Sequence, residues 1–210
     1  MWLIRGDEVQ VGEGAGSFLM ELGSFYISKS VITNEEIEAW QPGRRRLATS
    51  PGDSDPAVGV SFREALGYCE WYAEVSGKPF RLPTELEWEF ACCAGGSHRY
   101  YWGEDPAAVG DQAWTRECAQ GRCRQADEGG LNPQGLYNMI GNTWEWTSSM
   151  DRPALLQSDD DCDDTRITGP RVIRGGSFRD TLTSLSSRSR QVLKEAECRD
   201  DLGFRIVRSL

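Results

Sequence analysis

The stretch NPQGLYNMIGNTWEW, Asn132–Trp146, combines turn-forming residues with oxygen-bearing side chains and two closely spaced tryptophans. Within it, Asn138 and Glu145 supply side-chain oxygens, and Gly141 and Thr143 lie between them with free main-chain carbonyls. Calcium accepts several oxygen ligands in flexible geometry, whereas zinc prefers thiolate or imidazole ligands, which this stretch lacks. The pattern therefore predicts a calcium site formed by Asn138, Gly141, Thr143 and Glu145.

A second interpretation of the same residues stays open. Buried polar side chains have to satisfy nearby backbone groups, so Asn138 and Glu145 could hold the loop together without a metal. Trp144 and Trp146 are core or floor residues under both interpretations.

Outward from this stretch, helix starts can be read from capping boxes, in which a Ser or Thr caps the first turn and a Glu three residues later bonds back to it. The pairs are Thr33 with Glu36, Ser61 with Glu64, and Thr84 with Glu87. They predict helices near residues 34–40, 62–75 and 85–93. Gly77 is a plausible left-handed cap for the second helix.

Short β-rich runs predict strands near residues 24–32, 171–175 and 203–209. Long connections rich in Gly, Pro and Asp separate the elements, and we find no tandem repeat. The pattern predicts an α+β fold that is rich in loops, with short strands and two main helices. A chain of 210 residues fits a single domain over residues 1–210.

Five segments occur in an order that resembles the formylglycine-generating enzyme family, from about Phe25 to Leu210. They are FYISKSVITNEEIEAW, PAVGVSFREALGYCEWYAEVSGKPFRLPTELEWEFA, YYWGEDP, GLYNMIGNTWEWT, and RVIRGGSF with the later GFR. The resemblance implies a variant of the C-type lectin fold. It also implies that Asn138, Gly141, Thr143 and Glu145 bind calcium through two side chains and two backbone carbonyls.

The loop after RGGSF departs from the family in the residues that carry its chemistry. Formylglycine-generating enzymes have a copper-binding cysteine pair there, but no cysteine lies between Phe178 and Arg190, and Asp180 stands at the first position. Copper(I) needs soft thiolate ligands, which Asp, Thr and Ser cannot replace. We therefore predict that the chain does not generate formylglycine. An atypical oxidoreductase of the same family is an alternative, and it would need a metal other than calcium.

The same loop is our candidate recognition surface, because binding residues concentrate on loops presented by a rigid core. Its candidate ligand-binding residues, which offer a guanidinium, a carboxylate and hydroxyls, are Arg179, Asp180, Thr181, Thr183 and Ser184. The partner would be a protein or a small polar ligand, and substitutions in this loop would change binding and leave folding intact. One branch of the family diversifies this loop through retroelements, so a diversified variable binding protein is a further alternative.

Composition limits the partners and the location. Lys and Arg number 23 against 33 Asp and Glu, and the net charge of −10 disfavours nucleic acid. Early charges argue against a signal peptide, and no apolar run is long enough for a membrane span, so we expect a cytoplasmic protein. The single histidine excludes a His-rich iron site. Cys118 and Cys123 could pair or hold a metal, although reduced thiols fit a reducing compartment better.

Overall fold

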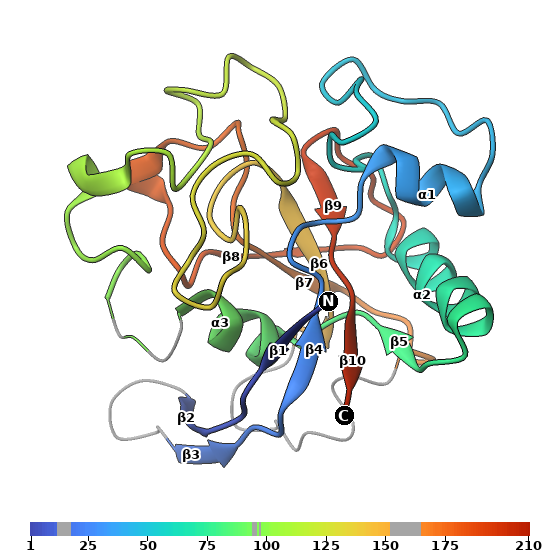
Figure 1. Cartoon of the computed structure of the whole chain (residues 1–210), viewed down its shortest axis with the longest axis horizontal. Coiled ribbons are helices and arrows are strands. Elements are labelled where there is room, and N and C mark those ends of the chain that lie inside the picture. Colours follow the sequence, from blue (N-terminus) through green and yellow to red (C-terminus); the bar gives the residue numbers. More distant parts are fainter. Residues whose placement is uncertain (12–17, 94–95, 97, 152–164) are drawn as a thin grey trace.

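The structure, a computed structural model, describes residues 1–11, 18–93, 96, 98–151 and 165–210. Along these residues, short helices and strands alternate with long connections (Figure 1). The elements in chain order are β1 (Trp2–Ile4), β2 (Glu8–Val11), β3 (Phe18–Glu21), β4 (Phe25–Ile27), α1 (Asn34–Trp40), α2 (Phe62–Ser76), β5 (Phe80–Arg81), α3 (Glu85–Cys93), η2 (Pro106–Val109), β6 (Trp144–Met150), β7 (Arg171–Arg174), η4 (Leu182–Ser184), β8 (Arg190–Leu193), β9 (Leu202–Phe204) and β10 (Val207–Ser209). The sequence also offers an acidic cluster as a candidate for binding a divalent ion, formed by Asp159, Asp160, Asp161, Asp163 and Asp164, and this cluster lies outside the described residues.

The predicted capping boxes are present at the starts of α1, α2 and α3. At α3, the Glu87 amide donates to Thr84 Oγ1 over 3.0 Å, and the Thr84 amide donates to the Glu87 carboxylate over 2.8 Å. Helix α2 runs one residue beyond the predicted end and closes at Gly77, whose φ of 67° is the left-handed conformation that glycine adopts without strain. These helix positions are set by local contacts, which is why the sequence predicts them closely.

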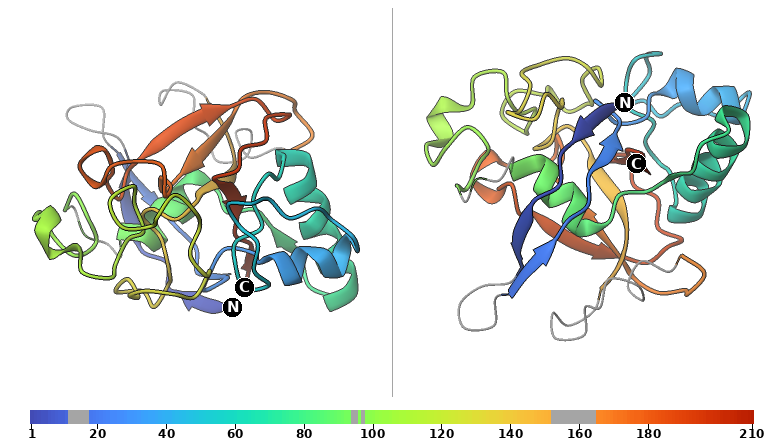
Figure 2. Two further views of the ribbon diagram at one scale, coloured as in Figure 1. Left: turned by 90° about the horizontal axis from the view of Figure 1, so that it is seen from above. Right: turned by 60° about the horizontal axis from the view of Figure 1, so that its bottom comes forward.

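The strands form two four-stranded sheets, ordered β1-β4-β10-β5 and β8-β7-β6-β9, and β2 pairs with β3 in a hairpin. Neighbours are antiparallel except β6 and β9, which are parallel. Figures 1 and 2 show β1 and β4 side by side, with α2 on one side of the molecule and η2 on the opposite side. The connection between α3 and β6 passes through η2 and then reaches the loop after α1, where the Cys123 and Ala126 amides donate to the Thr49 and Ser54 carbonyls.

Two of the predicted strands differ from the observed ones. The segment predicted near residues 24–32 is a strand only over Phe25–Ile27. The run 203–209 is not one strand, because β9 pairs with β6 while β10 pairs with β4 and β5. Between them, the Ile206 carbonyl accepts a hydrogen bond from the Ser28 amide. The C-terminal segment thus crosses from one sheet to the other.

Two hydrophobic clusters fill the core. One packs around Trp146, whose ring lies 5.7 Å from that of Phe62, and includes residues of α2 and β9. The other packs around Trp88 on α3 and includes residues of β4 and of the stretch before β6. Both tryptophans are completely buried. None of the helices in the described residues is long and apolar enough to span a membrane.

Candidate functional site

Glu145, the carboxylate of the predicted calcium site, forms a buried ion pair with Arg205. Arg205 Nε lies 2.6 Å from Glu145 Oε2, its Nη2 lies 2.7 Å from Oε1, and both side chains are 0% exposed. Trp88 Nε1 donates a third hydrogen bond, 2.6 Å long, to Oε2. A bidentate ion pair between an arginine and a carboxylate can remain ionised when it is buried, because each charge has a hydrogen-bonded counterion. Glu145 therefore links β6 to α3 and to the segment between β9 and β10.

The other predicted ligands lie in a turn with unusual backbone conformations. Asn138 has a φ of 54°, and its Nδ2 donates to the Ala126 carbonyl over 3.0 Å. Gly141 has a φ of 78°, and a Cβ there would lie 2.4 Å from the Trp114 carbonyl oxygen, so only glycine fits. The Gly141 carbonyl accepts a hydrogen bond from the Thr143 amide over 2.8 Å. Hydrogen bonds within the protein therefore fix the conformation of this turn without a bound ligand.

The oxygens of this turn suit calcium in type and have acceptor capacity left. Glu145 Oε1 accepts one hydrogen bond, and Asn138 Oδ1 accepts none from the described residues. No group of three or more His, Cys, Asp or Glu side chains in the described ranges could hold a metal, so a cation here would depend on neutral oxygens beside Glu145. The Arg205 guanidinium weakens the attraction of that carboxylate for a cation. The donor set fits calcium and does not fit a soft metal.

Asp180, at the family's first cysteine position, is bound into the structure. Its Oδ2 accepts hydrogen bonds from the Ser177 amide over 2.9 Å, from Ser177 Oγ over 3.0 Å, and from Trp144 Nε1 over 3.0 Å. A ligand that binds this carboxylate would have to use Oδ1 or compete with these three donors for Oδ2. Asp180 anchors the loop to the first residue of β6 because a carboxylate can satisfy several donors at once.

Arg179 projects outward from this anchored turn. Its side chain is 51% exposed and forms an ion pair with Asp200, with Nε 3.2 Å from Oδ1. The hydrogen bond to Asp200 raises the pKa of Arg179 further above its ordinary value. The guanidinium also lies 4.9 Å from the ring centroid of Phe178, which is buried. A partner that binds Arg179 would have to compete with or share Asp200.

The remaining candidates lie on or beside η4. Thr183 and Ser184 are exposed, whereas Thr181 is partly buried. Ser184 Oγ donates to the Thr181 carbonyl over 2.7 Å, and Thr181 and Thr183 hydroxyls are 3.5 Å apart. Arg99 donates to the main-chain carbonyls of Thr183 and Leu185. The loop therefore presents its exposed hydroxyls on a backbone that is tied down.

Residues far away in sequence brace the loop, and sequence reasoning missed them. The Arg116 amide donates to the Asp180 carbonyl over 2.9 Å, and Arg116 Nε donates to the Arg179 carbonyl over 2.7 Å. The Glu117 carboxylate accepts a hydrogen bond from the Leu182 amide over 3.3 Å. No local pattern marks Arg116 or Glu117, because the contacts span more than sixty residues of chain.

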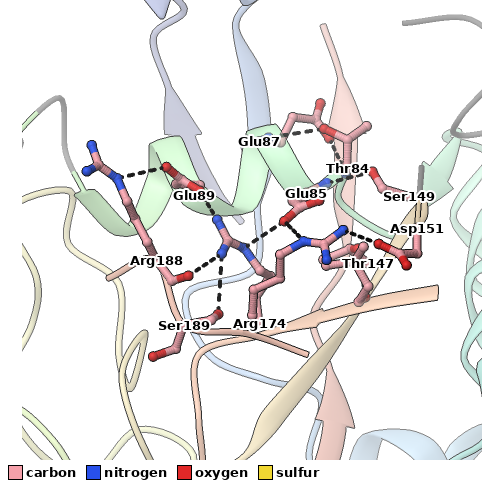
Figure 3. Close-up of polar contacts among 12 residues, drawn as sticks. Thr84, Glu85, Glu87, Glu89, Thr147, Ser149, Asp151, Arg174, Arg188 and Ser189 are labelled. Atoms are coloured by element: carbon pink, nitrogen blue, oxygen red, sulfur yellow. Dashed lines mark hydrogen bonds and ion pairs between the residues drawn. The ribbon is translucent and has the colours of Figure 1, made fainter. Parts of the chain in front are cut away.

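An ionic network holds the far end of the loop (Figure 3). The buried Arg174 of β7 pairs with Glu89 of α3, and its Nη1 donates to the Arg188 carbonyl over 2.7 Å. Burial lowers the pKa of Arg174 to about 10. Arg190 joins Glu85 over 2.8 Å. The loop is thus fixed by Asp180 at its start and by the α3 network at its end.

The described cysteines are free thiols. Cys118 is exposed, and its Sγ accepts a hydrogen bond from the Thr115 amide over 3.3 Å. Cys123 is buried and packs against Phe178. Burial raises its pKa well above the ordinary value for a thiol, so Cys123 stays protonated and unreactive at neutral pH. The two thiols considered for pairing are therefore separate in this structure.

Comparisons with known proteins agree with the fold and the motifs. The family model described as "Sulfatase-modifying factor enzyme 1-like domain" matches residues 2–210. Inactive C-alpha-formylglycine-generating enzyme 2 from Mus musculus is 32% identical over 194 residues, which cover 81% of this chain and 57% of that protein. The chain spans about half the length of the curated relatives it matches.

Two solved structures share the fold over nearly the whole chain. Treponema denticola variable protein 1 superimposes with a TM-score of 0.84 at 19% identity, covering 100% of this chain and 95% of that one. PvdO from Pseudomonas aeruginosa gives a TM-score of 0.84 at 22% identity, covering 99% and 93%. At these identities the likeness concerns the fold alone. Together with the family match, it shows that the chain belongs to the sulfatase-modifying factor enzyme 1-like, or formylglycine-generating enzyme, family and has its α+β fold.

Proposed function

We propose that this domain is a non-catalytic binding module that recognises a protein or a small polar ligand through the loop after Phe178. The observation that carries the proposal is Asp180. It stands where the family has its first active cysteine, and its carboxylate accepts three hydrogen bonds from within the domain. The loop has no thiol to bind copper(I). Its backbone carbonyls accept hydrogen bonds from Arg99 and Arg116. The similarity to a curated relative named as inactive supports the same reading.

Some side chains of the loop would contact the partner, and others stabilise the conformation of the loop. Arg179, Thr183 and Ser184 project outward, so we assign partner contact to them. Asp180 and Thr181 support the turn from within, because the Asp180 carboxylate and the Thr181 carbonyl both accept hydrogen bonds from loop residues. A rigid loop loses little conformational entropy on binding, which favours recognition.

Calcium is the second part of the proposal. We place it at Asn138, Gly141, Thr143 and Glu145, supported by the acceptor capacity left on Asn138 Oδ1 and Glu145 Oε1. When bound, calcium would supply a fixed positive charge that holds oxygens of the turn together. Trp144, next to the turn, contacts Asp180, so the ion would also steady the recognition loop.

The other functions considered from the sequence have less support. An atypical oxidoreductase would need a redox metal, and the described residues bring together no cluster of ligands for one. A retroelement-diversified surface stays a prediction, as does a cytoplasmic location. A near-identical template repeat and a reverse transcriptase gene beside this one would support diversification.

The proposal is tested by separating binding from folding. Parent protein and an Arg179→Ala variant are immobilised, and the proteins they retain from the native lysate are identified and then titrated singly. We expect a specific partner to lose affinity by about 2 kcal/mol or more in the variant, since hot-spot residues contribute on this scale. An Arg63→Ala variant, which removes an exposed paired arginine elsewhere, is the matched control. Partners that bind all three proteins equally would contradict recognition by this loop.

A further inference from the structure

A cavity of about 230 Å³ lies between the loop after α1 and the loop before the Asn138 turn. Its lining comes from the first loop through Pro51, Gly52 and Asp55, and from the second through Arg122, Cys123, Arg124, Gln125 and Glu128. In Figure 1, the first loop is the pale blue one beyond α1, and both loops lie at the end of the molecule away from the C-terminus. The cavity is large enough for a small molecule but not for a folded partner.

Arg124 has an incomplete set of hydrogen bonds. Its Nη2 donates to Glu128 Oε1 over 2.8 Å, and its guanidinium lies 4.9 Å from the ring centroid of Trp114. Its Nε is buried and has no hydrogen-bond partner. Because Nε is closed to solvent, a ligand in the cavity would contact the accessible part of this partly exposed side chain, and the Nε–Hε group reports such a contact from the same guanidinium. Trp114 and Glu128 hold the guanidinium in one orientation, which prepares it for such a contact.

The charges around the cavity favour an anion beside the second loop. Arg124 is balanced by Glu128, whereas the exposed Arg122 has no ion pair with any residue the structure describes. The first loop carries Asp55, whose Oδ2 accepts a hydrogen bond from the Gly52 amide over 2.8 Å. Asp55 is 8% exposed and would repel an anion placed against it. A ligand that suits both loops needs an anionic group at the arginines and a hydroxyl or amine donor at Asp55.

We propose that this cavity binds a small anion whose carboxylate or phosphate oxygens contact Arg122 and Arg124 and whose donor group faces Asp55. Arginine suits both kinds of oxyanion because its planar group donates two hydrogen bonds at once. The ligand lies beside the recognition loop, since Cys123 lines the cavity and packs against Phe178. This site goes beyond the proposed function and does not depend on it, because it takes its own ligand.

The test is a titration of the ¹⁵N-labelled full chain with inorganic phosphate, glycolate or acetate, followed through the Nε–Hε signal of Arg124. Sodium chloride at equal ionic strength is the reference. We expect a saturable shift of that signal with phosphate or glycolate, and the probe that saturates first identifies the oxyanion. Acetate lacks a donor for Asp55, so it should bind more weakly than glycolate. Equal shifts in chloride, or none with any probe, would overturn the proposal.

Variants keep the test independent of folding. Arg122→Gln removes an exposed charge and should weaken binding about tenfold, the usual effect of one charge-assisted hydrogen bond. Arg45→Gln, which removes an exposed arginine outside the cavity, should bind like the parent. Gln125→Trp fills the cavity without changing its charge and should abolish the saturable shift. Unchanged affinity in both Arg122→Gln and Gln125→Trp would show that the anion binds elsewhere and would refute this site.

Discussion

The indole of Trp144 donates a hydrogen bond to Asp180, with Nε1 3.0 Å from Oδ2. Trp144 begins β6 and precedes Glu145, so one short stretch of strand contacts both the recognition loop and the proposed calcium turn. A residue that replaces the family's first cysteine has thereby become a structural anchor.

Asp180→Ala should lower the free energy of unfolding by about 1–3 kcal/mol, because it leaves the Trp144 indole and the Ser177 amide without their acceptor. Asp180→Asn should lose less, since one side-chain oxygen remains. Chemical denaturation measures both, with the exposed Asp127→Ala as control. If Asp180→Ala and Asp127→Ala unfold at the same denaturant concentration as the parent, the anchor has no energetic importance.

Arg205→Met should lower stability by about 3–5 kcal/mol, because it leaves the Glu145 carboxylate buried without its counterion. Arg63→Met, which breaks an ion pair that is 48% exposed on the arginine side, should lose under about 1 kcal/mol. Urea unfolding of the two variants gives the comparison. Equal losses in the free energy of unfolding would mean that burial does not make the Glu145–Arg205 ion pair more important for stability than an exposed pair.

Calcium binding predicts a melting temperature that depends on the metal. At about a hundredfold excess over Kd, binding to the folded state adds about 2.7 kcal/mol, which corresponds to roughly 5–10 °C for a domain of this size. EDTA should remove this gain from the parent. Asn138→Gly deletes one proposed ligand oxygen while glycine tolerates the φ of 54°, so the variant should respond less to calcium.

Asn142→Gly is the matched control for that experiment. Asn142 also has a positive φ, of 62°, but its side chain bonds to the Arg124 backbone and not to the proposed ion. This variant should melt lower than the parent and keep the full calcium response. A parent protein whose melting temperature is the same in EDTA and in calcium would exclude the metal site.

The capping carboxylate Glu64 predicts a specific pH dependence. Burial acts to raise its pKa, but hydrogen bonds from the Ser61 hydroxyl and amide and from Arg44 outweigh burial, and the net pKa lies below the ordinary value. A lowered folded-state pKa means that the stabilisation is complete above the unfolded-state pKa and is lost as pH falls through the folded-state value. The difference in melting temperature between the parent and Glu64→Gln should therefore narrow as the pH falls below the ordinary pKa of glutamate, about 4.3. A constant gap down to pH 3 would show that Glu64 does not carry the effect.

The helices were predictable because their signals are local. The pairs Thr33 with Glu36 and Ser61 with Glu64 contact each other within one turn, so the sequence alone places α1 and α2 within a residue. The C-terminal segment was not predictable in the same way. Residues 203–209 have the pattern of one strand, but β9 pairs with β6 in one sheet and β10 pairs with β4 in the other. These pairings join residues that are distant in the sequence, so a local pattern does not predict them.

The sequence brings the four proposed calcium ligands within one short segment, and their binding of calcium stays a prediction. In the structure Asn138 lies in the turn before β6, whereas Glu145 lies within β6. The sequence around Glu145 does not predict its ion pair with Arg205. Arg205 lies sixty residues later and donates hydrogen bonds to both carboxylate oxygens. The hydrogen bond from the Trp144 indole to Asp180 crosses thirty-six residues, so the sequence around Asp180 does not predict this contact.

The proposed lack of formylglycine-generating activity is tested most directly with a cysteine peptide of the sulfatase type. The purified full chain is incubated with the peptide, copper and a reductant under oxygen, and the product mass is measured. The account predicts no aldehyde above the protein-free blank, with or without copper, because the loop from Phe178 to Arg190 holds no thiol. Aldehyde that increases with protein concentration and disappears in a Cys198→Ser variant would contradict it.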